Sequence, residues 1–162
     1  MWSVTSLLSG MRLANLALGN ASSIEGNTDR VRSWNYGELE LSDGKLLGIY
    51  PRWWPRIGSQ LEAFQDSYVR TLPTDYCRVY YAFPRSAPGF MSVLYARSGP
   101  NTQYKTLFRA VGVMDKIAML RDSDAIVCQA IGLRTTERLM NRWGYVRHAL
   151  AVGDNHYIKR LK

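Results

Sequence analysis

The stretch FMSVLYARSGPNTQYKTLFRAVGVMDKIAMLRDSDAIVCQAI, residues 90–131, decides the fold. Residues 90–97 are rich in strand-forming side chains and predict a β-strand. Apolar residues at 107, 111, 114 and 118 recur at helical spacing and predict an amphipathic helix of about five turns. The run 125–131 is short and nearly all apolar, which predicts a strand buried on both faces. Together these elements predict a parallel β-α-β unit with a right-handed crossover.

Three hairpins surround this unit. Asp43-Gly44 separates strand patterns at 36–41 and 45–50, and Asp-Gly favours a type I′ turn. Pro88-Gly89 separates 77–83 from 90–97, and Gly153-Asp154 separates 145–152 from 156–161. Because hairpins outnumber the crossover, we expect an α/β fold of the α+β type. Its central sheet is mixed and mostly antiparallel, with helices packed on it.

The remaining segments predict helices and loops. Helical spacing indicates helices at 4–18 and 56–70, and a short one that Thr135 or Thr136 caps and Gly144 closes. Residues 19–33 are rich in Gly, Ser, Asn and Asp and predict a loop. Pro51 to Pro55 is not expected to be regular strand, and Asn101 and Thr102 are candidate helix caps. A chain of 162 residues predicts a single domain over 1–162, with 1–35 as a peripheral helix and loop.

Composition excludes several classes of protein. The chain is 46% hydrophobic and 21% charged, which excludes intrinsic disorder. Two cysteines are too few for a disulfide scaffold. No apolar run approaches the roughly 18 residues that a membrane-spanning helix needs. The first residues lack the basic start of a secretion signal. We therefore expect a cytoplasmic protein with no membrane partner.

The positive charge is concentrated in the C-terminal part. The net charge is +8, of which residues 97–162 contribute +7 and residues 1–96 contribute +1. Such asymmetry favours an anionic partner, either nucleic acid, an anionic membrane surface or a phosphate-bearing cofactor. The alternative is an arginine-rich surface without a specific partner. Basic residues recur at i, i+4 spacing in two stretches and would form stripes on helix faces: Lys105 and Arg109, and Arg134, Arg138 and Arg142.

The last part of the chain resembles a known family. Strand 124–131, helix 134–143 ending in Trp143-Gly144-Tyr145, and a hairpin closing with Tyr157-Ile158-Lys159 resemble the C-terminal half of the GNAT superfamily of acyl-CoA N-acyltransferases. The order of elements fits this family over residues 76–162. The resemblance implies transfer of an acetyl or other acyl group from acyl-CoA to an amine of a small molecule or protein. It also implies that the pantetheine arm lies between strands 90–97 and 124–131.

The resemblance further implies that the loop opening the long helix binds the pyrophosphate through backbone N–H groups. The cofactor-binding candidates are Arg97, Gly99, Asn101, Thr102, Gln103, Tyr104, Lys105 and Arg138.

This sequence departs from the family pattern at three places. The family loop reads Arg/Gln-x-x-Gly-x-Gly/Ala, whereas here only Arg97 matches, and Pro100 removes one amide donor. Met140 stands where many members have a proton-donating tyrosine, and Leu133 lies near the usual position of an asparagine. The alternative is therefore a non-catalytic protein on the same fold, whose basic C-terminal half binds nucleic acid or an acidic protein.

The catalytic candidates are Glu38, Tyr95 and Cys128. A carboxylate such as Glu38, Glu40 or Asp75 can act as a general base, and the alternative is a solvent-facing side chain opposite the buried face of a strand. Tyr80, Tyr81 or Tyr95 could donate the proton that Met140 cannot, and the alternative is core packing. Cys128, like Cys77, is a nucleophile if its thiol is exposed near a cation, and otherwise an inert buried thiol.

Two further patterns are weaker. His148 and His156 lie near each other in the last hairpin with Cys128 as a third candidate, but the spacing matches no known metal motif, so we expect no metal site. The segment Arg52-Trp53-Trp54-Pro55-Arg56 could stack a planar ligand. Its alternative is packing that seals a hairpin end.

Overall fold

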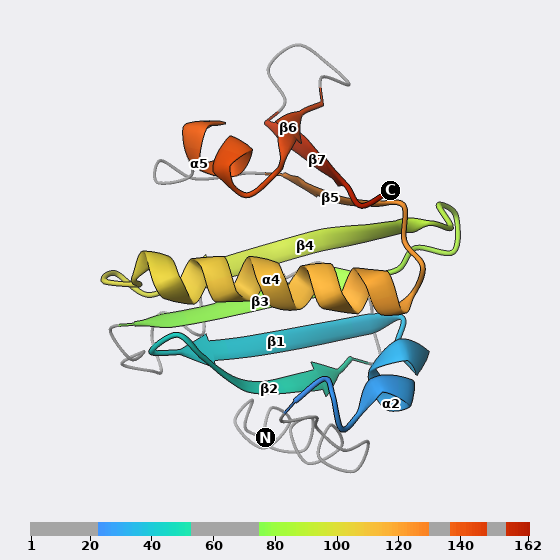
Figure 1. The fold of residues 1–162 in the computed structure, drawn as a ribbon, viewed down its shortest axis with the longest axis horizontal. Coiled ribbons are helices and arrows are strands. Elements are labelled where there is room, and N and C mark those ends of the chain that lie inside the picture. The colour runs from blue at the N-terminus through green and yellow to red at the C-terminus, as the bar shows by residue number, and fades with distance from the viewer. Residues whose placement is uncertain (1–22, 53–74, 130–136, 149–154) are drawn as a thin grey trace, which may run out of the picture.

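The computed structural model describes residues 23–52, 75–129, 137–148 and 155–162. Seven strands form one sheet in the order β2-β1-β3-β4-β5-β7-β6 (Figure 1). The strands are β1 (Tyr36–Ser42), β2 (Lys45–Pro51), β3 (Tyr76–Ala82), β4 (Phe90–Ser98), β5 (Ala125–Gln129), β6 (Val146–Arg147) and β7 (His156–Arg160). The described helices are α2 (Thr28–Ser33), α4 (Tyr104–Leu120) and α5 (Glu137–Arg142).

Strands β4 and β5 are the one parallel pair among the described strands, and α4 connects them. Every other described pair is antiparallel. This confirms the predicted β-α-β unit and the predicted fold class, a mixed and mostly antiparallel sheet flanked by helices. From β3 to β7 the described elements also follow the order that the resemblance implies for residues 76–162.

The two N-terminal hairpins turn where the sequence predicts. Asp43 and Gly44 have φ values of 52° and 73°, as a type I′ turn requires. Gly89, with φ of 88°, closes the connection between β3 and β4. Strand β2 extends through Pro51, so the expectation that Pro51 lies outside the strand is wrong. Proline is tolerated there because β2 is the outermost of the described strands on its side of the sheet, where an amide donor is dispensable.

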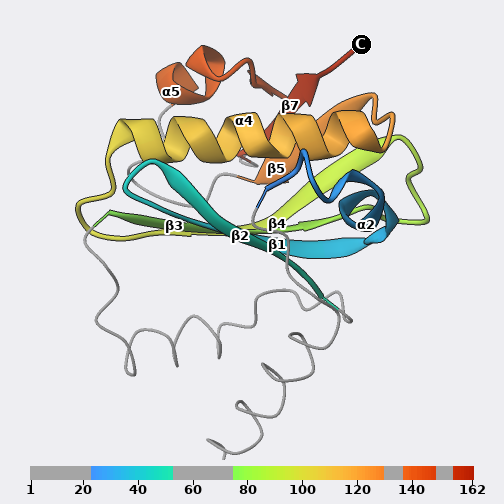
Figure 2. The ribbon, with the colours of Figure 1, turned by 60° about the horizontal axis from the view of Figure 1, so that its bottom comes forward.

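The core lies between α4 and one face of the sheet (Figures 1 and 2). Alternate residues of each strand point toward the helix. The buried strand residues of this face include Leu39, Leu41, Ile49, Val79, Tyr81, Met91 and Ile126, and α4 contributes Val111, Met114, Ile117 and Ala118. Burying these side chains is the main stabilising contribution, at about 1.5–3 kcal/mol for each large one.

The sequence prediction is wrong at three further elements. Residues 28–33 form α2 instead of loop, because Val31 is fully buried in the core and α2 packs against α4. Helix α4 begins after Gln103 with no side-chain cap from Asn101 or Thr102. Strand β5 is buried only in its first half, since Gln129 is exposed.

Helix α5 ends as predicted, with Gly144 at φ of 85°. The predicted helices at 4–18 and 56–70, the cap at Thr135 or Thr136 and the turn at Gly153-Asp154 lie outside the described residues. Of the segment 1–35, the described part places Ile24 and Val31 in the core. No helix among the described residues is long and apolar enough to span a membrane.

Candidate functional site

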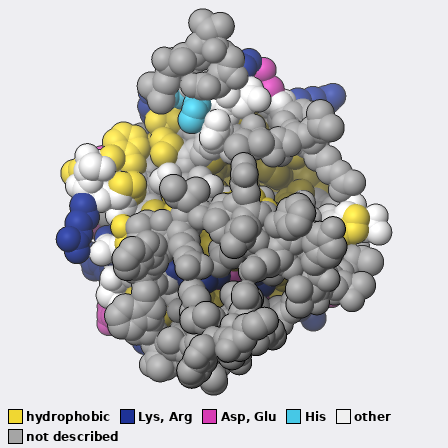
Figure 3. All heavy atoms as spheres, turned by 180° about the vertical axis from the view of Figure 1, so that it is seen from behind, with side chains coloured by type: hydrophobic (Ala, Val, Ile, Leu, Met, Phe, Trp, Pro, Cys, Tyr) yellow, Lys and Arg dark blue, Asp and Glu magenta, His cyan; other side chains and the backbone are white. Residues whose placement is uncertain are grey.

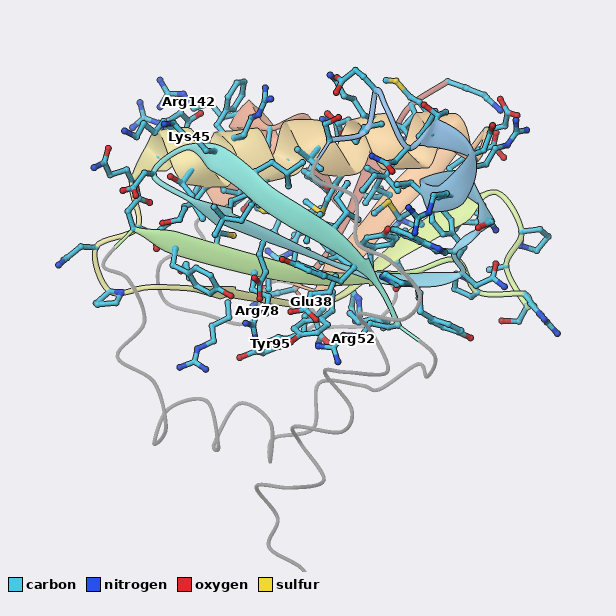
Figure 4. The ribbon with its side chains drawn as sticks, turned by 90° about the horizontal axis from the view of Figure 1, so that it is seen from below. Glu38, Lys45, Arg52, Arg78, Tyr95 and Arg142 are labelled. Atoms are coloured by element: carbon cyan, nitrogen blue, oxygen red, sulfur yellow. The ribbon has the colours of Figure 1, made fainter. Side chains whose placement is uncertain are left out.

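The face of the sheet opposite α4 carries a group of charged and phenolic side chains. Register pairs Glu38 with Tyr80 and Glu40 with Arg78 across β1 and β3, so these residues share one face. Arg52 follows Tyr50 of β2 by two residues and joins them. Figure 4 shows Glu38, Arg52, Arg78 and Tyr95 close together on this face. Basic and acidic side chains are also visible near its middle in Figure 3.

Glu38 is held by two guanidinium groups. One carboxylate oxygen, Oε1, lies 2.8 Å from Nε of Arg78, and the other, Oε2, pairs with Arg52. Arg78 also reaches Oε1 of Glu40 at 2.5 Å. Glu38 and Arg78 are only 5% and 7% exposed. Ions this deeply buried are stable only when each finds its partner, so the four side chains form one unit, the buried ion network.

Tyrosine hydroxyls complete this network. The Tyr76 hydroxyl donates to Oε1 of Glu40 at 3.1 Å. The Tyr80 hydroxyl accepts from Arg52 at 3.2 Å and from Arg78 at 3.4 Å. Arg52 also lies over the ring of Tyr80, 5.0 Å from its centroid. Tyr80 is therefore fixed in position by two cations, and its ring contacts that of Tyr95 on β4, with centroids 6.0 Å apart.

Burial sets the protonation of these groups. Burial raises the pKa of Glu38, and the cations Arg52 and Arg78 oppose that rise. Burial alone would lower the pKa of Arg78, but Glu38 and its other neighbours raise it, so Arg78 stays a cation. Burial raises the pKa of Tyr80 to about 12. Tyr80 is consequently a neutral phenol at physiological pH.

The sequence predicts Glu38 as a general base or as a solvent-facing side chain, and its position in the structure matches neither. It is not solvent-facing, because 5% exposure removes it from water. Both of its oxygens are taken by arginines, so it is less free to accept a proton than a general base needs to be. Arg52 and Arg78 were not singled out as its partners, because the sequence does not give the register that brings them to it.

Tyr95 lies on β4, beyond the last described pair of its ladder with β5. The parallel ladder runs from Phe90↔Ala125 to Val93↔Cys128, and no later pair exists among the described residues. Strand β4 continues to Ser98. Its register against β3 slips between Tyr80 and Tyr81, which leaves Leu94 as a bulge. Bulges redirect side chains and are common beside functional sites. Tyr95 follows this bulge directly and is half-buried.

Cys128 is the last β5 residue in the ladder with β4. It is partly buried, and burial raises the pKa of its thiol to about 12. Tyr145 and Asp115 lie near it, since burial and the charges of Cys128 and Asp115 raise the pKa of Tyr145. Asp115 pairs with Lys159 at 2.6 Å. Cys128 therefore stays a neutral thiol at physiological pH, in a setting that does not activate it.

The loop before α4 is tied to the protein by its own amides. The Gly99 N–H donates to the Tyr76 carbonyl at 2.8 Å, and the Thr102 N–H donates to the Gly99 carbonyl at 3.3 Å. The Gln103 N–H donates to Oδ1 of Asp75 at 3.1 Å. Asp75 is 4% exposed, and its carboxylate caps α4 in place of the predicted side chains. Three of the amides expected for a pyrophosphate are thus engaged internally.

The other predicted cofactor residues surround this loop. Arg97 is half-buried and lies opposite Arg78 in the ladder between β3 and β4. Asn101, Tyr104, Lys105 and Arg138 are exposed. Tyr104 and Lys105 open α4, where the first N–H groups of a helix have no partner inside the helix. The exposed side of the first turn of α4 is therefore where the predicted phosphate site still has available N–H donors.

His148 and His156 are adjacent, because the His148 N–H donates to the His156 carbonyl at 2.8 Å. No group of three or more potential metal ligands occurs among the described residues. Trp53 and Trp54, with the Arg134 position of the second basic stripe, lie outside the described part of the chain.

Comparison with known proteins gives similarity in structure to solved proteins. The chain is similar to the crystal structure of nourseothricin acetyltransferase, with a TM-score of 0.45 and 9% sequence identity. The alignment covers 88% of this chain and 98% of that chain. No protein-family model and no curated protein matches the sequence.

Proposed function

We propose that the protein is a GNAT-type N-acyltransferase, which moves an acyl group from acyl-CoA to an amine. The observation that supports it most is the parallel pair of β4 and β5, whose described ladder ends at Val93↔Cys128 while β4 continues to Ser98. We infer that the two strands separate beyond this pair, so that the edge of β4 offers N–H and C=O groups that an extended, amide-containing chain can bind. The pantetheine arm of CoA is such a chain. Its entry there brings the thioester toward Tyr95.

The phosphates of the acyl-CoA would bind at the exposed side of the first turn of α4. The free amides of Tyr104 and Lys105 and the ammonium group of Lys105 are the donors there. Arg138, on α5, is a second cation for this role. Asp75 at the same helix end opposes anion binding, so we expect weaker binding than a glycine-rich loop would give.

Acyl transfer needs an amine that has lost a proton and a donor for the departing sulfur. The amine nitrogen bonds to the acyl carbon, the C–S bond breaks, and the nitrogen proton leaves to water. Tyr95 donates its phenolic proton to the thiolate and regains one from solvent. Glu38 acts as a positioning residue: it holds Arg52 and Arg78, these hold the hydroxyl of Tyr80, and the ring of Tyr80 contacts that of Tyr95.

A thermal-shift titration with acetyl-CoA and free CoA tests the binding step. A ligand at about 100 times its Kd adds roughly 2.7 kcal/mol to the stability of the native state. That corresponds to a Tm rise of several degrees for a domain of this size. A saturable shift with both ligands supports the proposal, and no shift at millimolar concentration contradicts it.

A second experiment tests the chemistry by measuring CoA release in the presence of a panel of primary amines. We expect Tyr95→Phe to lower kcat at least tenfold and to leave the acetyl-CoA shift unchanged, since the ring remains and only the proton donor is lost. Tyr36→Phe, at the far end of β1, is the matched control and should retain full activity. Equal activity of the Tyr95→Phe and wild-type proteins would remove Tyr95 from the mechanism.

A further inference from the structure

Three aromatic rings gather on the surface at the start of α4. Tyr104 and Phe108 lie one turn apart with ring centroids 6.0 Å apart and an interplanar angle of 19°. Trp143, directly after α5, stacks on Tyr104 with ring centroids 6.3 Å apart. Tyr104 and Phe108 remain 46% and 56% exposed. We call these three rings, with Arg142, the stacking patch.

Exposed apolar side chains that contact one another in a patch, unlike single ones, mark binding surfaces. Phe108 has no polar atom that water could solvate, and its exposed fraction is among the largest of the described hydrophobic side chains. The near-parallel rings present flat faces. Flat faces are suited to other planar groups, whereas rings in a protein core pack as often edge to face.

Cations surround the stacking patch. The guanidinium of Arg142 lies over Tyr104, 5.9 Å from the ring centroid. The side chain of Lys105 reaches the Gly44 turn, next to Lys45. Figure 4 shows Lys45 and Arg142 near the same end of α4. Within the described part of the chain, no carboxylate forms an ion pair with Lys45, Lys105 or Arg142.

The opposite end of α4 has a different charge balance. There Lys159 pairs with Asp115, Lys162 pairs with Asp124, and Arg32 lies 3.9 Å from Asp122. These three cations are therefore neutralised by the protein itself. The exposed rings lie instead at the end where Lys45, Lys105 and Arg142 have no ion pair with a described carboxylate.

We propose that the stacking patch binds single-stranded nucleic acid. Bases would stack on the exposed rings of Phe108 and Tyr104, while Lys45, Lys105 and Arg142 contact the phosphates. Rings that stack on bases need a strand whose bases are unpaired, which favours single strands over duplex. The stacking patch shares Tyr104 and Lys105 with the phosphate site proposed for acyl-CoA, whereas Phe108, Lys45 and Arg142 lie outside that site, so substitutions at Phe108 distinguish the two proposals.

The test measures fluorescence anisotropy of a labelled 15-nucleotide oligo(dT) with the full chain at low salt. We expect binding of the single strand, and at least tenfold weaker binding of a duplex of the same length. Phe108→Ala should weaken oligo(dT) binding about tenfold or more, given what one stacked base contributes. Met119→Ala is the matched control, because Met119 is 58% exposed at the other end of the same helix.

The two components of binding can be separated. Phe108→Tyr keeps a ring and should retain the wild-type affinity. Lys105→Ala should reduce the dependence of log K on log salt by about one unit. Lys116→Ala, on the same helix but paired with Glu25 at 3.1 Å, should leave it unchanged. Thermal denaturation of each variant establishes that it is folded.

Three results would overturn the proposal. The first is an affinity for oligo(dT) that Phe108→Ala leaves unchanged. The second is equal loss in Phe108→Tyr and Phe108→Ala. The third is displacement of oligo(dT) by adenosine 3′,5′-bisphosphate at lower concentration than by unlabelled oligo(dT), which would assign the stacking patch to a mononucleotide. A thermal shift with CoA that persists in Phe108→Ala would leave the acyltransferase proposal standing.

Discussion

The two faces of the same sheet are held in opposite ways. The face under α4 buries apolar side chains such as Leu39 and Val79. The face opposite buries ions, with Glu38 and Arg78 less than one-tenth exposed. Both faces are built from the same strands by alternate residues. The two faces differ in how they respond to a substitution. Shortening one side chain removes contacts from the apolar face, whereas removing one ion leaves its partner on the ionic face as an unpaired buried charge.

The largest effect is expected from Arg78→Met. It leaves Glu38 with Arg52 as its ion-pair partner and removes the ion pair between Arg78 and Glu40. Breaking a buried pair costs about 3–5 kcal/mol. Leu39→Ala on the apolar face should cost about 2–5 kcal/mol through its cavity. Urea denaturation at pH 7 measures both changes.

The pH dependence distinguishes the two faces more sharply than the size of the loss. Removing Arg78 raises the pKa of Glu38 further, because burial already raises it and one opposing cation is gone. The folded state favours the protonated form of a carboxyl whose pKa is higher in the folded than in the unfolded protein. The loss of stability that this carboxyl causes is therefore absent at a pH below the unfolded pKa and complete at a pH above the folded pKa. The deficit of Arg78→Met should therefore shrink from pH 7 to pH 4, while that of Leu39→Ala stays constant. Parallel curves for the two variants would contradict this assignment.

The same contrast explains which parts the sequence predicts. Alternation places Glu38 and Glu40 on one face, and the Asp43-Gly44 turn fixes the hairpin, because both are local properties of the chain. Of the charges that meet Glu38, Arg78 lies on β3 and Arg52 directly follows β2, and their positions depend on register across the sheet. From the alternation of polar and apolar residues, the simplest prediction is that the polar side of the strand faces solvent. Only the tertiary structure shows that this side is buried as well.

The start of α4 is a second example. Helical periodicity predicts the helix itself, since the buried residues recur along one stripe. Its cap comes from Asp75, far away in the sequence, and no local motif encodes it. Val31 likewise belongs to a segment whose composition predicts a loop, and its burial against the core makes that segment helical.

Two glycines, one from each face, provide a smaller effect. In Gly37→Ala the new Cβ would lie 2.3 Å from the ring of Tyr81, which is 1% exposed and cannot move aside. We expect a loss of about 1–3 kcal/mol, as for other overpacked cores. In Gly48→Ala the Cβ would lie 2.7 Å from the Tyr50 hydroxyl, at the far end of a half-exposed side chain. Its cost should be below about 1 kcal/mol, and equal costs in denaturant titration would show that the two faces are equally rigid.

A smaller change in stability is expected from substitutions at Asp75, whose carboxylate accepts from the Gln103 N–H at the start of α4. Asp75→Asn keeps an acceptor for the Gln103 N–H and should cost less than about 1 kcal/mol, whereas Asp75→Ala loses the cap and should cost about 1–2 kcal/mol. If phosphates bind at this helix end, both variants should strengthen CoA binding several-fold by removing a like charge. Weaker binding of CoA to Asp75→Asn in a thermal-shift titration would place the phosphates elsewhere.

The smallest effect concerns the two thiols, which both belong to the apolar face. Burial raises the pKa of Cys77 and of Cys128 to about 12, so only about one thiol in ten thousand is a thiolate at pH 8. The rate of alkylation by iodoacetamide in the native protein should rise about tenfold per pH unit up to pH 10, without the plateau near pH 8.5 that a solvated thiol shows. Mass spectrometry of Cys77→Ser and Cys128→Ser follows each thiol separately. A plateau at Cys128 alone would mean that β5, where its ladder with β4 ends, is open to solvent on the α4 side. The contrast between the two faces would then hold for β1 and β3 but end at β5, the strand beside which the pantetheine arm is proposed to lie.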